Sequence, residues 1–469
     1  MSTPPAAAKH PTEILVVLLL AGISFALSQT MIVPALPALA EDFDADPAAA
    51  SWLLTAYLLS ASVATPIIGK LGDLFGKGRM LTLVLLAFSF GSLICAIAPS
   101  IEVMVLGRVI QGAAGGVFPL SFGIIRDTFP RERVPSGIGL LSAVFGIGGG
   151  IGLPLAGVIV DELHTSVIFW LGLMALPAAL AAHRLVPPSP RVERTKIDWL
   201  GAVILSTALV ALLYGVTNAN DWGWTSGSTL GLIGLGLALT VVWVAVERRV
   251  EQPLVDMRLM RMRAVAATNL AGLLVGFAMF SCFLLIPQFA QAVESTGYGF
   301  GMSVTESGLL LVPSSIVMLV AGPLAGSVGA RWGFRATLMV GTLFAAAAFG
   351  WLAAEHGSPW HFVVSGVLLG AGLSFSFASM ANLIVAAVPQ GDVGVATGIN
   401  TIMRSIGGAF GSAVATALLV SDTLPSGLPA LGGYNAAFIM SAGVALLAFL
   451  AAMLVPKLRA ARVPAPAPA

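Results

Sequence analysis

The chain has 469 residues, of which 57% are hydrophobic and 10% are charged, and its formal net charge is +1. A soluble domain of this length carries charges on roughly a quarter of its residues to cover its surface. The composition therefore excludes a water-soluble globular protein and indicates that lipid surrounds most of the chain. Cys95 and Cys282 both lie inside apolar runs, so a disulfide framework is not expected.

Fourteen apolar stretches are long enough to cross a membrane, because a spanning helix needs about 20 mostly apolar residues. Six lie in the first part of the chain, at 14–37, 50–69, 80–98, 102–124, 136–160 and 166–186. Two follow at 199–217 and 229–247. The last six lie at 265–290, 305–328, 335–354, 361–387, 398–420 and 434–455. The sequence thus predicts an all-α integral membrane protein with 14 transmembrane helices.

The basic residues test this count, since cytoplasmic loops of membrane proteins are enriched in lysine and arginine. With the N-terminus in the cytoplasm, 21 of the 23 basic residues fall on the cytoplasmic side, and only Arg108 and Arg404 lie inside spans. External loops instead carry acids such as Glu41, Asp42 and Asp44. We therefore expect a multi-pass protein of the cytoplasmic membrane with both termini in the cytoplasm. Topology also explains the basic clusters, so no nucleic-acid partner is expected.

The sequence repeats itself between its two ends. The loop at 69–79 and the loop at 326–335 share three glycines and a basic ending, and the spans at 136–160 and 398–420 align glycines at a fixed offset. Internal repeats are common in transporters. We therefore predict a six-helix half at 1–186, linkers and two inserted spans at 187–264, a second six-helix half at 265–456, and a cytoplasmic tail at 457–469.

Four segments carry a resemblance to a known family. They are the loop with Gly69, Asp73, Gly76 and Lys77; the span with Arg108, Gln111 and Gly112; the span from Gly146 to Gly157 with Pro154; and the opening span around Gln29 and Thr30. Over essentially its whole length the chain resembles the fourteen-span drug:proton antiporter family of the major facilitator superfamily. It departs from the family at Ser28, where an aspartate is expected, and at Pro34, where an asparagine is expected.

The resemblance implies the major facilitator fold and a secondary active exporter of amphiphilic small molecules, such as drugs or secondary metabolites. Export would proceed by alternating access and be driven by proton antiport. Two alternatives remain: a facilitated or lipid-type exporter without proton coupling, and a non-transporting receptor or scaffold on the same fold. Nothing in the sequence indicates an enzyme, a cofactor or a metal site, and we expect a monomer.

Arg108 is the leading functional candidate, because a charge near the middle of a span is costly and usually faces a partner or a water-filled cavity. The alternative is a structural arginine bonded to backbone carbonyls of a neighbouring helix. Arg404 lies nearer the cytoplasmic end of its span and could extend to the interface. The predicted substrate and coupling residues are Arg108, Gln111, Gln29, Thr30, Arg404 and Asn400.

Acidic residues are absent from the middle of every predicted span, and Ser28 cannot titrate in place of the family's aspartate. A proton-coupled exporter usually holds a carboxylate in its cavity. The sequence therefore makes proton coupling less secure than the resemblance suggests, although Asp42 or Asp161 could serve in an outward-facing state. Positive charge without acidic counter-charge favours neutral or anionic substrates over permanent cations.

Two segments are predicted to move during transport. Asp73 is expected to form a cytoplasmic latch with a helix N-terminus or with Arg126, Arg131 or Arg133, and a simple solvated turn is the alternative. The glycine-rich span around Pro154 is expected to rock between the halves, with static close packing as the alternative. The predicted gating residues are Gly69, Asp73, Gly76, Lys77, Gly146, Gly150, Pro154 and Gly157.

Overall fold

A computed structural model describes residues 11–45, 47–188 and 198–457 of the chain. Apart from one isolated bridge between Thr423 and Pro429, the regular structure of this part is helical. It contains 14 helices or helix pairs long and apolar enough to cross a membrane, which confirms the predicted number of spans. The predicted linker at 187–198 and tail at 457–469 fall almost wholly outside the described residues.

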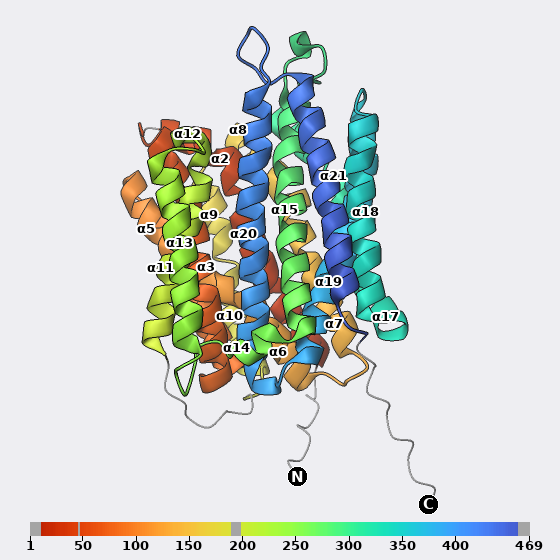
Figure 1. Ribbon diagram of the computed structural model, residues 1–469. Coiled ribbons are helices and arrows are strands. Elements are labelled where there is room, and N and C mark those ends of the chain that lie inside the picture. Colours follow the sequence, from red (N-terminus) through yellow and green to blue (C-terminus); the bar gives the residue numbers. More distant parts are fainter. Residues whose placement is uncertain (1–10, 46, 189–197, 458–469) are drawn as a thin grey trace, which may run out of the picture.

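The first six spans form one half of a tall bundle (Figure 1). Their helices are α1 (Pro11–Thr30), α2 (Ile32–Asp42), α3 (Pro47–Phe75), α4 (Lys77–Ala96), α5 (Ile101–Gln111), η1 (Gly112–Gly116), α6 (Val117–Thr128), α7 (Val134–Ile147), η2 (Gly148–Gly152), α8 (Leu153–Glu162), α9 (Val167–Gly172) and α10 (Ala175–Leu185).

The inserted segment contains α11 (Trp199–Thr217), α12 (Ala219–Trp222), α13 (Gly227–Glu247) and α14 (Met257–Arg261). The other half contains α15 (Arg263–Gln291), η3 (Glu294–Thr296), α16 (Val304–Leu309), α17 (Val312–Trp332), α18 (Phe334–Ala354), α19 (Pro359–Ala387), η4 (Gln390–Asp392), α20 (Val393–Ser421) and α21 (Leu431–Leu454).

Several spans are interrupted where glycine or proline weakens the α-helical hydrogen-bond ladder. Span 4 changes to a 3₁₀ turn at Gly112–Gly116 between α5 and α6. Span 5 widens to a π turn at Gly148–Gly152, immediately before Pro154. Turns of both kinds frequently mark functional or mobile positions within long helices. The sequence singled out the glycine-rich span around Pro154 as one that could bend and move, but it did not predict the change of helix type in either span.

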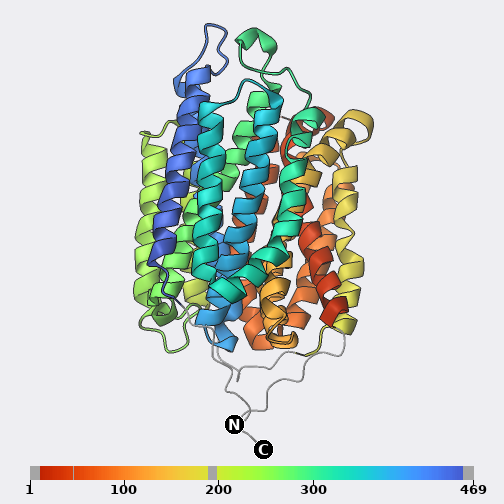
Figure 2. The ribbon, with the colours of Figure 1, turned by 90° about the vertical axis from the view of Figure 1, so that its right-hand side faces the viewer.

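The two largest contacts between the halves are pairs of helices. One pair is α3 with α20, and the other is α7 with α17. The inserted helices α11 and α13 pack against each other and flank this arrangement at one side, where α11 contacts α3 and α20 (Figures 1 and 2). The core of each half is built mainly from its own apolar side chains, and the inserted pair joins it through Leu205, Leu209 and Ile399. These contacts match the predicted major facilitator architecture.

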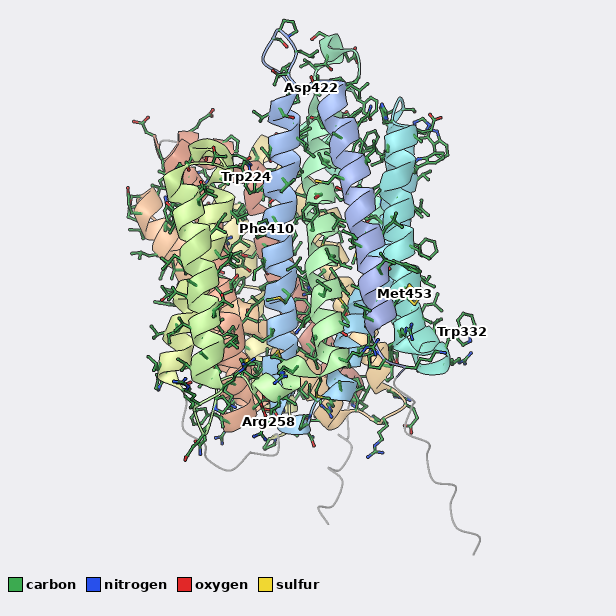
Figure 3. The ribbon with its side chains drawn as sticks, in the orientation of Figure 1. Trp224, Arg258, Trp332, Phe410, Asp422 and Met453 are labelled. Carbon is green, nitrogen blue, oxygen red and sulfur yellow. The ribbon has the colours of Figure 1, made fainter. Side chains whose placement is uncertain are left out.

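The charged side chains separate between the ends of the bundle. We call the end with Lys77, Arg126 and Arg258 the basic end, and the end with Asp161 and Asp422 the acidic end; Figure 3 shows Arg258 and Asp422 at opposite ends. In the described part of the chain, every lysine and arginine other than Arg108 and Arg404 lies towards the basic end. This pattern follows the predicted loops.

Candidate functional site

Arg108 lies at the centre of a buried hydrogen-bond network in the first half. Its Nε donates to the carbonyl of Leu53 at 2.8 Å, and its Nη1 donates to Gln111 Oε1 at 2.7 Å and to Ser28 Oγ at 3.1 Å. Gln111 in turn donates to Ser92 Oγ at 2.7 Å. The side chain of Arg108 is only 1% exposed, yet none of these partners carries a charge. A buried guanidinium is therefore held entirely by neutral oxygens.

Close backbone packing places these groups together. A Cβ on Gly115 would lie 2.5 Å from the carbonyl of Ala61, and one on Gly107 would lie 2.9 Å from the carbonyl of Gly91, so the backbones of α3 and α4 approach span 4 closely. As a result the ring of Tyr57 on α3 lies 4.1 Å from the guanidinium carbon of Arg108. An arginine over an aromatic face gains a cation–π attraction, which is larger when both groups are desolvated.

Arg404 is the second buried arginine within a span, and it lies at the contact between the halves. Its guanidinium carbon is 4.7 Å from the centre of the Phe145 ring on α7 and 4.6 Å from that of Phe377 on α19. Phe145 belongs to the first half and Phe377 to the second. Arg404 is 6% exposed and has no ion pair among the described residues. It does not extend to the interface, which was one of the sequence expectations.

Aromatic rings connect the two arginines. Phe25 lies 6.2 Å from Tyr57 and 6.4 Å from Phe145, measured between ring centres. Phe118 stacks on Phe145 at 4.1 Å, and Phe377 meets Phe145 at 5.5 Å in an edge-on arrangement. We call Arg108, Arg404 and these rings the arginine–aromatic centre. Its members come from α1, α3, α5, α6, α7, α19 and α20.

The other predicted substrate residues lie apart from these contacts. Thr30 Oγ1 donates to the carbonyl of Gly148 at 2.7 Å and so joins α1 to the π turn of span 5. Asn400 donates to Asn269 Oδ1 at 3.1 Å and to the carbonyl of Thr268, which joins α20 to α15. Both therefore act as helix–helix contacts here. Gln29 is half-buried.

No carboxylate reaches the arginine–aromatic centre in the described part of the chain, where every acid lies in a loop or near a helix end. The same residues include no group of three or more potential metal ligands. A cavity of about 10 Å³ lies beside Ser28, lined by Ser24, Met31 and Gly172, which is room for about one water molecule. In this conformation the centre is packed and would have to open to admit a substrate.

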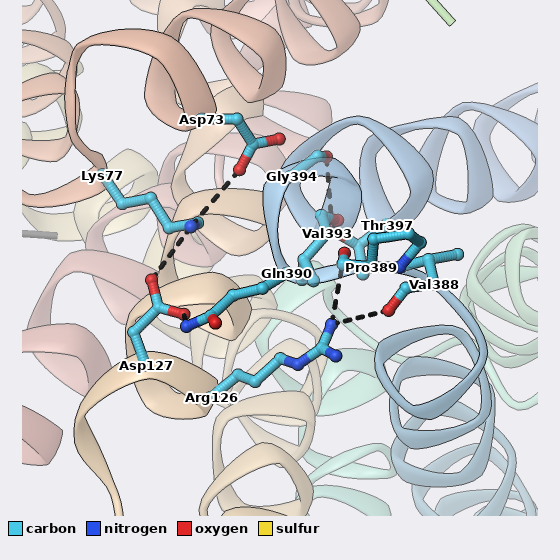
Figure 4. A network of polar contacts seen from close by, with 10 residues as sticks. All are labelled: Asp73, Lys77, Arg126, Asp127, Val388, Pro389, Gln390, Val393, Gly394 and Thr397. Atoms are coloured by element: carbon cyan, nitrogen blue, oxygen red, sulfur yellow. Dashed lines mark hydrogen bonds and ion pairs between the residues drawn. The ribbon is translucent and has the colours of Figure 1, made fainter. Parts of the chain in front are cut away.

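The basic end is held by a buried network shown in Figure 4. Lys77 Nζ donates to Asp127 Oδ2 at 2.9 Å and lies 3.3 Å from Asp73 Oδ1. Asp127 Oδ1 accepts from Gln390 Nε2 at 2.7 Å, which crosses to the second half. Asp73, Lys77 and Asp127 are each less than 10% exposed. Of the predicted gating residues, Asp73 and Lys77 are thus brought together as an ion pair.

Asp73 also lies against the beginning of α20. A Cβ on Gly394 would lie 3.0 Å from Asp73 Oδ2, and one on Gly69 would lie 2.6 Å from the Gly394 carbonyl. The first turn of a helix carries unpaired amides and partial positive charge, which favours a carboxylate. Arg126 donates instead to the carbonyls of Val388 and Pro389, at 3.0 and 3.5 Å. Asp73 Oδ2 thus lies beside the first turn of α20, and the ion-pair partner of Asp73 is Lys77 rather than one of the predicted arginines.

Four of the remaining predicted gating residues lie along the contact between span 5 and span 10. Gly146 and Gly150 face Met318 and Ser315 of α17, and Ser315 Oγ donates to the Gly146 carbonyl. A Cβ on Gly157 would lie 2.5 Å from Thr305 Oγ1, and Pro154 packs against Gly308. Gly76 has a φ of +102° and forms the turn between α3 and α4.

Sequence reasoning missed several members of these sites. Tyr57, Phe145 and Ser92 look like ordinary apolar or small residues of a span, and only their contacts with the arginines distinguish them. Gln390 begins the short helix η4, 263 residues from Asp127, so no local pattern could connect them. Asp127 did carry a signal, because it is a charged residue at the end of a span.

Comparisons with known proteins agree with this architecture. The profile of the Major Facilitator Superfamily matches residues 18–300 and 268–469. The chain is 30% identical to the "Tetracenomycin C resistance and export protein" of Streptomyces glaucescens over 89% of this chain and 79% of that protein. It is also 30% identical to the "Multidrug resistance protein B homolog" of Mycobacterium tuberculosis, over 81% and 70%.

Among solved structures, the human organic anion transporter MFSD10 superposes with a TM-score of 0.66 over 94% of this chain and 99% of that chain, at 18% identity. That similarity supports the fold alone. The family profile covers nearly all of the spans, and the relatives cover most of the chain. The protein therefore belongs to the major facilitator superfamily, within its fourteen-span drug antiporter family.

Proposed function

We propose that this protein is a secondary exporter of amphiphilic small molecules and works by alternating access in the cytoplasmic membrane. The observation that carries the proposal is the separate closure of the two ends. At the basic end, Asp127 and Gln390 join the halves. At the acidic end, Asp161 accepts from Thr305 Oγ1 at 3.1 Å, again between the halves. The names of relatives that export or resist drugs point the same way.

Alternating access would open one of these contacts at a time around the arginine–aromatic centre. Gly69 and Gly394 bring the backbones of α3 and α20 into contact. The two helices can therefore separate at this point without rearranging interlocked side chains. The π turn at Gly148–Gly152 offers a bend in span 5 close to Phe145. Rocking of one repeat against the other is the general mechanism of transporters with internal repeats.

The source of energy has two candidates. Proton antiport is the first, because the family resemblance implies it. A facilitated or lipid-type exporter without proton coupling is the second, and the neutral surroundings of Arg108 favour it, since Ser28 stands where a titrating carboxylate would be expected. Of the carboxylates described, Asp73 and Asp127 at the basic end are the buried ones that contact a gating residue.

Other roles find less support. The family and the relatives are transporters rather than enzymes. A non-transporting receptor or scaffold would have no need of two buried arginines whose charge is uncompensated. Both halves of the centre come from one chain, so we propose a monomer as the working unit, with the N- and C-termini in the cytoplasm and the lipid bilayer around it.

Inside-out vesicles with an acidified interior test the function and its energy source together. Cationic, neutral and anionic amphiphiles would be added in turn, while a pH-sensitive dye reports the internal pH and a labelled compound reports uptake. Proton release that accompanies uptake of one class would support antiport and identify the substrate charge. Uptake without proton release would favour the uncoupled exporter, and absence of uptake for every class would contradict export of amphiphiles.

A further inference from the structure

The arginine–aromatic centre contains two positive charges, and the negative charges needed to compensate them are absent from its described surroundings. Nη2 of Arg108 is buried and has no hydrogen-bond partner, although the other two nitrogens are fully engaged. Removing a charge from water without an opposite charge costs several kcal/mol in proteins. A conformation that admits an anion would remove this cost, and Nη2 is a donor ready for an acidic oxygen.

Arg404 adds a second condition on the substrate, which comes from its contacts with aromatic rings. Its guanidinium lies over the rings of Phe145 and Phe377, which are only 5.5 Å apart and therefore sit side by side against it. Only one of these rings belongs to the same half as Arg404. When the halves separate, Phe145 leaves with α7, and the guanidinium loses one of its two rings. Planar stacking of this kind is a property of arginine and not of lysine.

We infer that the protein transports aromatic organic anions: the aromatic ring of the substrate takes the place of Phe145 on Arg404, and Arg404 and Arg108 compensate its negative charge. This inference rests on the proposed export function and defines its substrate class. Phe25, Tyr57 and Phe118 would supply further ring contacts of the offset or edge-on kinds that aromatic groups prefer.

The substrate class also explains why no central carboxylate is needed. A cell interior is electrically negative, so the membrane potential itself drives an anion outward. The gain corresponds to a gradient of roughly 50-fold per charge for 100 mV. An exporter of anions can therefore work with two central arginines and no titrating acid. The same arginines repel cations, which is the opposite of a site built for cationic drugs.

The test uses purified full-length protein in proteoliposomes with a potassium diffusion potential set by valinomycin. Three probes have similar size but differ in charge or ring: 2-naphthoate, decahydro-2-naphthoate and 2-naphthylmethylammonium. A neutral naphthalene ether serves as a fourth. We expect 2-naphthoate uptake to exceed that of the other three at least tenfold and to increase when the interior is made positive.

Arg404→Lys separates stacking from charge. It should lower the ratio of 2-naphthoate to decahydro-2-naphthoate transport about tenfold, while both anions remain preferred over the cation. Arg331→Lys, at an exposed position near the basic end, is the matched control and should leave the ratio unchanged. A purely structural arginine would lower transport of all probes equally and would overturn the assignment.

The outcomes distinguish the two proposals. Transport of the cation or the neutral ether in preference to 2-naphthoate would overturn the inference while leaving export intact. Equal transport of 2-naphthoate and decahydro-2-naphthoate would overturn the role of the aromatic ring. If no probe moves in protein that melts cooperatively, the export function itself fails, and the inference fails with it.

Discussion

Arg108 makes several hydrogen bonds, but its positive charge has no negative partner among the described residues. Three hydrogen bonds to neutral oxygens fix its guanidinium, but they do not compensate its charge. Replacing a buried charge by an apolar group of similar volume is often neutral or stabilising. Stability therefore gives little reason for an arginine here, and function gives a strong one. The same reasoning applies to Arg404, whose described contacts are rings.

We predict that Arg108→Lys lowers transport about 10- to 100-fold, because an ammonium cannot reproduce the planar set of bonds to Leu53, Ser28 and Gln111. Arg108→Leu should abolish transport while thermal stability holds or rises. Vesicle uptake and thermal melting in detergent measure the two effects. Near-normal uptake by the lysine variant would show that the arginine is merely structural.

A second prediction concerns Ser28, whose Oγ accepts from Arg108 Nη1 at 3.1 Å. Ser28→Asp would place a carboxylate against the guanidinium, form a charge-assisted hydrogen bond and remove the excess positive charge. We expect uptake of cationic amphiphiles to increase about tenfold. Ser28→Asn has nearly the same size without the charge and should show no increase. Equal behaviour of the two variants would contradict the electrostatic argument.

The contact between the halves depends on a few glycine-rich helices. The α3–α20 contact is built on glycines that let two backbones touch, and the α7–α17 contact repeats the same solution at Gly139, Gly322 and Gly326. Spans 4 and 5 are not continuous α-helices, because their glycine runs change the hydrogen-bond pattern. The break in span 4 comes directly after Gln111, and the break in span 5 comes shortly after Phe145. The proposed moving parts and the proposed binding residues therefore lie on the same elements.

We predict that Gly69→Ala holds the basic end open, because the added Cβ would lie 2.6 Å from the Gly394 carbonyl. Overpacking of this kind costs about 1–3 kcal/mol. Thr65, which is 2% exposed and packs against Gly398, reports the opening after Thr65→Cys. Its maleimide labelling should become at least fivefold faster in the Gly69→Ala background, and transport should decrease.

Gly350→Ala provides the control for this experiment, because nothing lies within 4 Å of the Cβ it would add on α18. The two native thiols, Cys95 and Cys282, are buried and should give little background labelling. Unchanged labelling of Thr65→Cys in the Gly69→Ala protein would mean that the α3–α20 contact does not control access from the basic end.

At the scale of the whole molecule, charge and repeat symmetry organise the fold. Basic residues gather at one end, acids dominate the other, and the two repeats meet around a centre that contains both intramembrane arginines. The inserted pair α11 and α13 adds width at one side, against α3 and α20, and contributes none of the rings or hydrogen bonds of that centre. It therefore enlarges the scaffold without entering the proposed site.

The orientation predicts a simple labelling pattern. Ser426→Cys lies in the exposed loop between α20 and α21 at the acidic end, and Glu132→Cys lies in the exposed loop between α6 and α7 at the basic end. An impermeant maleimide should label the first in intact cells and the second only after permeabilisation. Labelling of Glu132→Cys in intact cells would reverse the proposed topology.

The sequence by itself determined the 14 spans, the separation of charge and the repeated architecture. Each of these features depends on the hydropathy of a single segment or on the composition of a single loop, because each segment inserts into the membrane according to its own residues. It also singled out Arg108 and Arg404, since an arginine inside a span is conspicuous on its own.

Only the tertiary structure decided what surrounds those arginines. The pairing of Arg404 with Phe145, of Arg108 with Tyr57, and of Asp127 with Gln390 joins residues from different helices, and two of the three pairs join different halves. An aromatic side chain in a span looks the same to a hydropathy pattern whether it faces lipid or a guanidinium. Which face it presents depends on packing between distant segments, and that packing is a property of the folded bundle.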